Sequence, residues 1–163
     1  NTGVVVDLTT GSATHISGGA TGRVSGIEDV WGGQGKDTLT GNEYANTLRG
    51  NGDNDRIFGR GGDDWLYGGA GNDSLYGGTG LDRLYGEGND DYLDGGLDGV
   101  RDEIFSGLGR DTFVDNQRWI ELTYKDGSPT GTGLWVSEDR INDFDPLYDI
   151  RQLRYPYKVL FPI

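Results

Sequence analysis

The chain has 163 residues with a formal net charge of −13, contains 31 Gly and no Cys, and is only 33% hydrophobic. This length suits one domain with a small cap, but the apolar content is too low for a conventional thick core. The absence of Cys excludes disulfides and thiolate metal sites, and the acidic balance disfavours nucleic-acid binding, which needs a basic face.

The first 31 residues hold a faint form of a nine-residue phrase that becomes regular from Gly32 onward. Val4 to Leu8 is predicted to be a strand followed by a turn. Arg23–Trp31 fits the nine-residue frame, with Glu28 at its sixth place and Val30 at its eighth. We interpret residues 1–31 as degenerate N-terminal coils of a repeat structure. Glu28 is more readily a capping or turn acid than a ligand.

Residues 32–114 repeat the phrase, for example as GGAGNDSLY from Gly68 and GGTGLDRLY from Gly77, with a two-residue insertion in the copy that begins at Gly95. Self-similarity at a short fixed period indicates one structural unit stacked on itself. The eighth position is always large and apolar: Leu39, Leu48, Ile57, Leu66, Leu75, Leu84, Leu93, Ile104 and Phe113. Its flanking residues are mostly polar or aromatic, so the last three positions predict a strand of about three residues whose eighth residue points inward.

The first six positions are dominated by Gly and predict a turn whose carbonyls face inward. Gly adopts positive φ without steric cost, and Asn and Asp tolerate it next best. Asn51, Asp53 and Asn89 are therefore expected to stand in for Gly. Two phrases make a coil of about eighteen residues, so turns one coil apart stack on the same edge of a parallel roll.

An acidic residue recurs at the sixth position of the phrase. One edge collects Asp37, Asp55, Asp73, Asp91 and Asp111, and the other collects Asn46, Asp64, Asp82 and Asp102. Neighbouring coils lie about 4.8 Å apart, at which distance carboxylates repel unless a cation lies between them. Carboxylate and carbonyl oxygens at a flexible turn suit Ca²⁺, which takes about six to eight oxygen ligands. Without metal the same composition favours a disordered linker.

The phrase GGxGxDxUx resembles the RTX repeat, a calcium-binding parallel β-roll. The resemblance implies an all-β, right-handed parallel β-roll, stapled by several Ca²⁺ ions and closed by a small β-rich C-terminal cap. It implies carboxylate ligands at Asp37, Asp55, Asp64, Asp73, Asp82, Asp91, Asp102 and Asp111, with carbonyl ligands around Gly33, Gly35, Gly69, Gly71, Gly78 and Gly80. The copy from Gly41 departs from the pattern, because Tyr44 replaces a Gly and Asn46 replaces the Asp.

Residues 115–163 are predicted to form the cap. Strands are expected at Arg118–Tyr124 and Leu134–Ser137, and the segment from Glu138 resembles the DxIxDF segment that follows RTX repeats. A solenoid needs a distinct terminal piece over its open edge, and the apolar cover is assigned to Trp119, Trp135, Ile141, Phe144, Leu147, Ile150 and Leu153. Asp143, Asp145 and Asp149 are either turn acids or ligands of a last ion.

Aromatic residues recur on the outward positions seven and nine: Phe58, Trp65, Tyr67, Tyr76, Tyr85 and Tyr92. Tyr67 and Tyr85 are predicted to fall one coil apart on one sheet, and Phe58 and Tyr76 on the other. Such rows are often cross-strand pairs. They could also form a platform for sugar rings, helped by Arg56, Arg60 and Arg83. An ice-binding face is disfavoured, because no regular outward row of Thr or Asn is present.

These features predict a monomeric calcium-binding module that folds as it binds several ions. About six ions would add about +12 and bring the module near neutrality. By resemblance, the module would leave the cell through type I secretion machinery and fold outside it, attached to neighbouring domains of a larger protein. No membrane span or signal peptide is visible. His15 is the only His, so neither a catalytic triad nor a zinc site can be assembled, and the chain is not expected to be an enzyme. The alternative is a carbohydrate-binding or substrate-positioning module.

Overall fold

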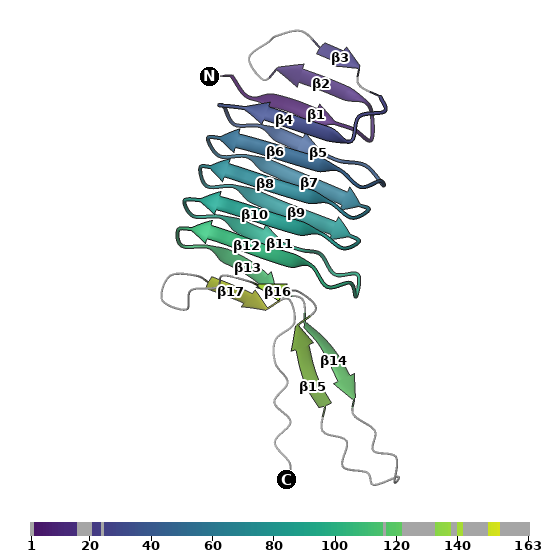
Figure 1. Ribbon diagram of the computed structural model, residues 1–163, viewed down its shortest axis with the longest axis vertical. Coiled ribbons are helices and arrows are strands. Elements are labelled where there is room, and N and C mark those ends of the chain that lie inside the picture. The colour runs from purple at the N-terminus through teal and green to yellow at the C-terminus, as the bar shows by residue number, and fades with distance from the viewer. Residues whose placement is uncertain are drawn as a thin grey trace.

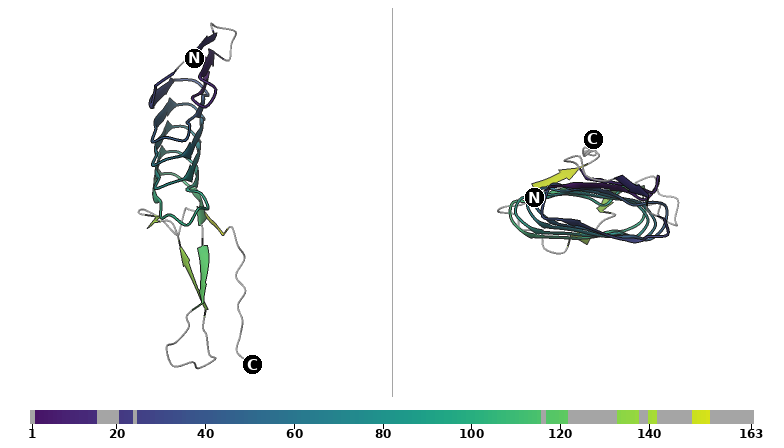
Figure 2. Two further views of the ribbon diagram at one scale, coloured as in Figure 1. Left: turned by 90° about the vertical axis from the view of Figure 1, so that its right-hand side faces the viewer. Right: turned by 90° about the horizontal axis from the view of Figure 1, so that it is seen from above.

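The computed structural model describes residues 2–15, 21–23, 25–115, 117–121, 133–137, 140–141 and 150–153. All regular structure in these segments is β-strand, and the strands wind into a parallel β-solenoid of about five turns (Figure 1). Viewed along its axis, the solenoid is a flattened ring of superposed coils (Figure 2). The predicted all-β roll is therefore confirmed. Nothing in the described segments is a helix long and apolar enough to cross a membrane.

Two sheets form the broad faces of the ring, and we name them sheet A and sheet B. Sheet A has the order β17-β13-β11-β9-β7-β5-β1-β2-β3, with the bounds β1 Val4–Asp7, β2 Ser12–His15, β3 Thr21–Arg23, β5 Thr38–Thr40, β7 Arg56–Gly61, β9 Ser74–Thr79, β11 Tyr92–Asp94, β13 Thr112–Asp115 and β17 Ile150–Leu153. Sheet B has the order β16-β12-β10-β8-β6-β4, with β4 Asp29–Gly33, β6 Thr47–Gly52, β8 Trp65–Ala70, β10 Arg83–Gly88, β12 Glu103–Leu108 and β16 Arg140–Ile141. A separate antiparallel pair consists of β14 Gln117–Glu121 and β15 Gly133–Ser137.

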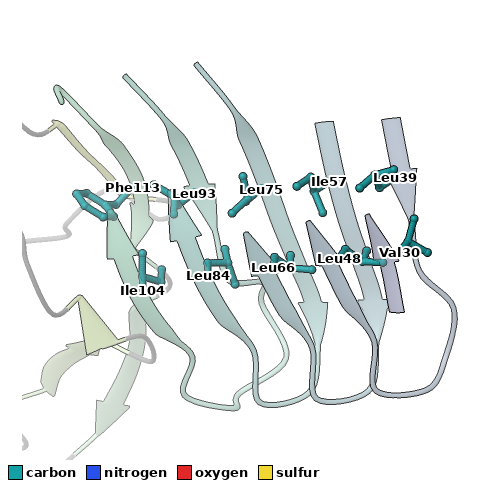
Figure 3. Close-up of a cluster of buried hydrophobic side chains, with 10 residues drawn as sticks. All are labelled: Val30, Leu39, Leu48, Ile57, Leu66, Leu75, Leu84, Leu93, Ile104 and Phe113. Atoms are coloured by element: carbon teal, nitrogen blue, oxygen red, sulfur yellow. The ribbon is translucent and has the colours of Figure 1, made fainter. Parts of the chain in front are cut away.

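The core is the predicted column of eighth-position side chains. Leu48 pairs in register with Leu66, which pairs with Leu84. Each sheet contributes one row, and the two rows face each other across the thin interior (Figure 3). From Leu39 to Phe113 every member is fully buried. Each coil supplies only two large apolar side chains, one from each sheet, so the core is thin. Its apolar contacts alone stabilise the stack weakly, and interactions in the turns must add to them.

Most strands are longer than the predicted three residues. Pairing continues past the ninth position into the second and third positions of the next phrase, as in Arg60 with Gly78 and Gly61 with Thr79. The prediction of about three residues is therefore wrong for β6, β7, β8, β9, β10 and β12, which have six residues each, whereas β5 and β11 have three and β13 has four. The first Gly of the next phrase, such as Gly59, is buried within the extended strand. The turns are correspondingly tighter than the sequence suggested.

The N-terminal residues meet the roll through β1 and β4. The strand β1 pairs parallel with β5, and Val4, Val6 and Leu8 pack against the core. The strand β4 pairs parallel with β6, and the Thr47 amide donates to the Glu28 carbonyl as it would to a sixth-position residue. Between them the chain leaves the parallel pattern, because β1-β2 and β2-β3 pair antiparallel.

The C-terminal segment adds to both sheets. The strand β16 pairs parallel with β12, and β17 pairs parallel with β13. The strands β14 and β15 overlap the two strands predicted there, with Trp119 in register with Trp135. The expected cap residues Phe144 and Leu147, and the acids at positions 143, 145 and 149, lie outside the described residues. Each sheet of the roll is therefore extended by one further strand beyond the last repeat.

Candidate metal centre

The sixth-position side chains form two ladders, one on each edge of the roll. We call them the Asp37 edge, with Asp37, Asp55, Asp73, Asp91 and Asp111, and the Asp64 edge, with Asn46, Asp64, Asp82 and Asp102. Every one of these side chains is at most 3% exposed. Each of these residues directly precedes a strand, and that strand pairs with the equivalent strand of the next coil. The Arg56 N–H, for example, donates to the Asp37 carbonyl one coil earlier. The structure thus gathers all eight predicted carboxylates into two buried rows.

One carboxylate oxygen of each Asp ties neighbouring coils together. Asp37 N–H donates to Asp55 Oδ1 at 2.8 Å, Asp55 N–H to Asp73 Oδ1 at 2.8 Å, and Asp73 N–H to Asp91 Oδ1 at 2.8 Å. The Asp64 edge repeats this pattern, with Asp64 N–H donating to Asp82 Oδ1 at 2.9 Å. Each carboxylate therefore reaches back to the amide of the preceding coil, which fixes its orientation within the stacked coils.

The second carboxylate oxygen has no such donor at four positions. Oδ2 of Asp55, Asp64, Asp73 and Asp91 is buried, and the described residues offer it no hydrogen-bond partner. In the Asp55 turn, this oxygen and the Gly68 carbonyl oxygen both lie where a side chain on Gly50 would begin. Burying an ionised carboxylate without compensation costs several kcal/mol. These oxygens are therefore suited to a bound cation.

Burial dominates the acid–base behaviour of the ladder. Desolvation raises the pKa of Asp55 and Asp64 from 3.8 to about 7, that of Asp73 to about 6 and that of Asp91 to about 8. The backbone hydrogen bond to each carboxylate lowers the pKa in part, whereas nearby acids raise it further, as Asp73 and Asp111 do for Asp91. Without a cation, a substantial fraction of these carboxyl groups in the folded roll therefore stays protonated near neutral pH.

Left-handed backbone conformations recur in the turns along the same edges. Positive φ occurs at Asn51 (82°), Asp53 (68°) and Asn89 (78°), which confirms the three predicted replacements for Gly. Arg60 (79°) and Glu87 (76°) are left-handed as well, although their residue types did not predict it. Both occupy the second position of the phrase, where Gly69 and Gly78 are left-handed, so position in the repeat was the available signal.

The predicted carbonyl ligands divide into two groups. Gly69, Gly71, Gly78 and Gly80 are left-handed, and the carbonyl oxygens one coil earlier crowd against them, so that a Cβ at Gly69 would meet the Asn51 oxygen. Gly33 and Gly35, in the first phrase, are not left-handed. Carbonyl oxygens thus lie between successive coils at Gly69, Gly71, Gly78 and Gly80.

The donor set at these turns is built from oxygen and is mainly backbone. In the described part of the chain, no three His, Cys, Asp or Glu side chains gather into one cluster. An ion between two coils would therefore draw on one or two carboxylates and complete its shell with carbonyls. This is the hard oxygen environment of Ca²⁺, whose coordination geometry is loose, whereas Mg²⁺ requires a near-ideal octahedron. The residues present fit a calcium ion.

The outward aromatic residues stack on one another rather than standing open. Tyr67 and Tyr85 lie 4.8 Å apart at 8°, and Phe58 and Tyr76 lie 4.9 Å apart at 9°, as the predicted register requires. Phe105, which was not among the predicted aromatic residues, continues the stack from Tyr85 at 4.8 Å and 1°. Tyr85 is stacked between Tyr67 and Phe105, so both of its faces are covered by neighbouring rings and not offered to a ligand.

Arginine side chains complete this stack on sheet B. The Arg49 guanidinium lies 4.0 Å from the centre of the Tyr67 ring, and that of Arg83 lies 4.9 Å from the centre of the Trp65 ring. Arg83 also forms a salt bridge of 3.0 Å with Glu103 one coil on. Cation–π contacts of this kind contribute about 0.5–1 kcal/mol each at exposed sites. The outer face of sheet B therefore helps to hold successive coils together.

Comparison with known families agrees with this geometry. The family model described as RTX calcium-binding nonapeptide repeat (4 copies) matches the chain over residues 31–66 and again over residues 67–99. No curated protein matches the chain. The matched residues contain most of both Asp ladders, and the regular phrase continues beyond them to Val114.

Proposed function

We propose that this chain, whose residues 31–99 are RTX calcium-binding nonapeptide repeats, folds as it binds several calcium ions and so helps a larger secreted protein to fold and persist outside the cell. The repeat supports a calcium-binding module and is not a catalytic family. The role in secretion and the extracellular setting are the steps that go beyond the repeat itself.

The observation that carries the proposal is the row of buried carboxylate oxygens without donors. Asp55, Asp64, Asp73 and Asp91 each present one such oxygen at a turn lined by carbonyls. Bound calcium would supply positive charge between the coils. The protein's own groups would orient the site through the amide-to-Oδ1 ladder and exclude water by burial. Ion binding and folding are then coupled, because the site exists only when two coils are stacked.

The thin core explains why the coupling would be strong. Only two large apolar side chains per coil are buried, so apolar burial alone stabilises each coil weakly. Low calcium would keep the chain unfolded inside a cell, and millimolar calcium would fold it outside, in the affinity range of extracellular calcium modules. Type I secretion machinery, which would export the unfolded chain, is the proposed partner at that step, and neighbouring domains of the parent protein are the proposed partners afterwards.

A calcium titration tests the proposal. Far-UV circular dichroism and calorimetry should show a gain of β-structure with heat release as CaCl₂ is added to chelator-treated protein. MgCl₂ at the same ionic strength is the control and should have little effect, since screening alone does not fill the sites. Identical β-rich spectra in excess chelator and in excess calcium, with no heat of binding, would falsify the proposal.

The carbohydrate-binding alternative is weakened by the ring geometry. A sugar platform needs free aromatic faces, and those of Tyr67 and Tyr85 contact each other. The interpretation that remains is cross-strand stabilisation. Binding of a glycan by the calcium-loaded protein on an array, lost in the Tyr67→Ala plus Tyr85→Ala variant, would restore the alternative.

A further inference from the structure

The turns of the roll are of two kinds. From Gly50 onward every repeat turn has two left-handed residues: Asn51 and Asp53, Arg60 and Gly62, Gly69 and Gly71, Gly78 and Gly80, Glu87 and Asn89, Gly96 and Gly99, and Gly107 and Gly109. The two turns before them, Gly32–Asp37 and Gly41–Asn46, have none. The first coil therefore does not direct its turn carbonyls as the later coils do.

The Gly41–Asn46 turn is closed by its own side chains. Asn42 N–H donates to Asn46 Oδ1 at 2.8 Å, and Tyr44 N–H donates to Asn42 Oδ1 at 2.9 Å. Asn46 Oδ1 lies over Gly41 in the place that Oδ2 of Asp64 takes over Gly59. The amide oxygen here has a donor within its own turn and carries no charge, so this turn does not need a cation to compensate it.

The N-terminal segment donates hydrogen bonds to the other acceptor groups at the open end of the first coil. Val4 N–H donates to Asp37 Oδ1 at 2.7 Å. Leu8 N–H donates to the Thr40 carbonyl at 2.8 Å, and the Thr9 hydroxyl donates to the Gly41 carbonyl at 3.0 Å. The strand β1 thus covers the open end of the stack with hydrogen bonds, as a terminal repeat of a solenoid must.

We propose that the first coil, residues 32–48, is a calcium-free end coil, and that ions bind only between consecutive left-handed turns. This inference rests on the proposed function and specifies its sites. On the Asp37 edge the occupied gaps lie between Asp55 and Asp73, Asp73 and Asp91, and Asp91 and Asp111. On the Asp64 edge they lie between Asp64 and Asp82, and between Asp82 and Asp102.

The coordination number of calcium gives the physical reason. An ion between two coils needs about six to eight oxygens, and it can collect them only if both turns aim their carbonyls into the gap. Between Asp37 and Asp55, and between Asn46 and Asp64, only the second turn has left-handed residues. The gap between Asp37 and Asp55 keeps Asp37 Oδ2 and the Gly50 carbonyl oxygen, which both lie over Gly32. It lacks the carbonyl oxygens that left-handed residues of its first turn would add. Asp37, Gly33 and Gly35 are thereby removed from the ligands that the resemblance implied.

Counting bound calcium in the full chain tests this assignment. Native mass spectrometry in a calcium-containing volatile buffer compares the wild type with Asp37→Asn, Asn46→Asp and Asp73→Asn. The Asn at position 37 keeps an oxygen for the Val4 amide, and the fold of each variant is checked by far-UV circular dichroism. Asp37→Asn and Asn46→Asp should bind as many ions as the wild type. Asp73→Asn, which borders two occupied gaps, should lose up to two ions.

The outcomes separate the two levels of the proposal. Loss of an ion in Asp37→Asn, or gain of one in Asn46→Asp, would overturn the calcium-free end coil while leaving the module calcium-binding. If the wild type binds no calcium at all, the proposed function itself fails. Should Asn46→Asp not fold because of the added buried charge, the count for Asp37→Asn decides the question alone.

Discussion

Removing calcium should reverse the direction in which pH affects stability. The perturbation is a change from about pH 5 to about pH 8, applied to metal-free and to calcium-saturated protein. In the metal-free roll, burial raises the pKa of Asp91 from 3.8 to about 8, of Asp55 and Asp64 to about 7 and of Asp73 to about 6. The folded form therefore binds protons more tightly than the unfolded chain. Its stability is greatest below the unfolded value and declines as pH rises through these folded-state values.

The size of the effect follows from the same pKa values. Each tenfold difference in proton affinity corresponds to about 1.4 kcal/mol. Because the pH change starts at about pH 5, each of these buried carboxyl groups loses about 1–4 kcal/mol of folding free energy by about pH 8. A whole domain is stable by only about 5–15 kcal/mol. Losing the equivalent of a few such groups is enough to unfold the metal-free roll at about pH 8.

With calcium bound, stability should change with pH in the opposite direction. Protons compete with the ion for the carboxylate oxygens, so the calcium-saturated protein should become more stable over the range in which the metal-free protein becomes less stable. Thermal unfolding followed by circular dichroism measures both. The Asp73→Asn variant provides a matched control: without metal its melting temperature should fall less steeply than that of the wild type between about pH 5 and about pH 7, and with calcium it should be less stable. A metal-free melting temperature that stays level or rises with pH would refute the reasoning.

Three further predictions concern the core, the turns and the outer face. Leu66→Ala, at a fully buried core position, should cost about 2–5 kcal/mol in the calcium-loaded state, seen as a lower denaturation midpoint. Gly50→Ala should weaken calcium binding in calorimetry, because a Cβ would collide with the carboxylate of its own phrase, whereas Gly33→Ala, with its nearest neighbour at 4.0 Å, should bind as the wild type does. Tyr67→Ala plus Tyr85→Ala should lower the melting temperature, because the stacked pair contributes about 0.5–1.5 kcal/mol in addition to the apolar area that it buries. An unchanged melting temperature would show that the stack does not stabilise the contact between coils.

The period-nine pattern was sufficient to predict the roll from the sequence. Because every copy places its apolar residue at the eighth position, Leu48, Leu66 and Leu84 could be set in register without knowing any coordinates, and so could the stacking of Tyr67 on Tyr85. The two acidic ladders follow from the same arithmetic. Left-handed backbone at Asn51 could be predicted because the repeat supplies Gly at the equivalent position elsewhere.

Only the tertiary structure decided what each polar atom does. Nothing local distinguishes the two oxygens of Asp55, yet one accepts an amide from the preceding coil and the other is buried without a donor. Nor does the repeat show that Gly33, which ends β4 and pairs with Asn51, lacks the left-handed geometry of Gly69. A short period fixes which residues stack, because stacking is the same in every coil. The ends of the stack and the partners of single atoms depend on contacts between distant segments, which differ from coil to coil.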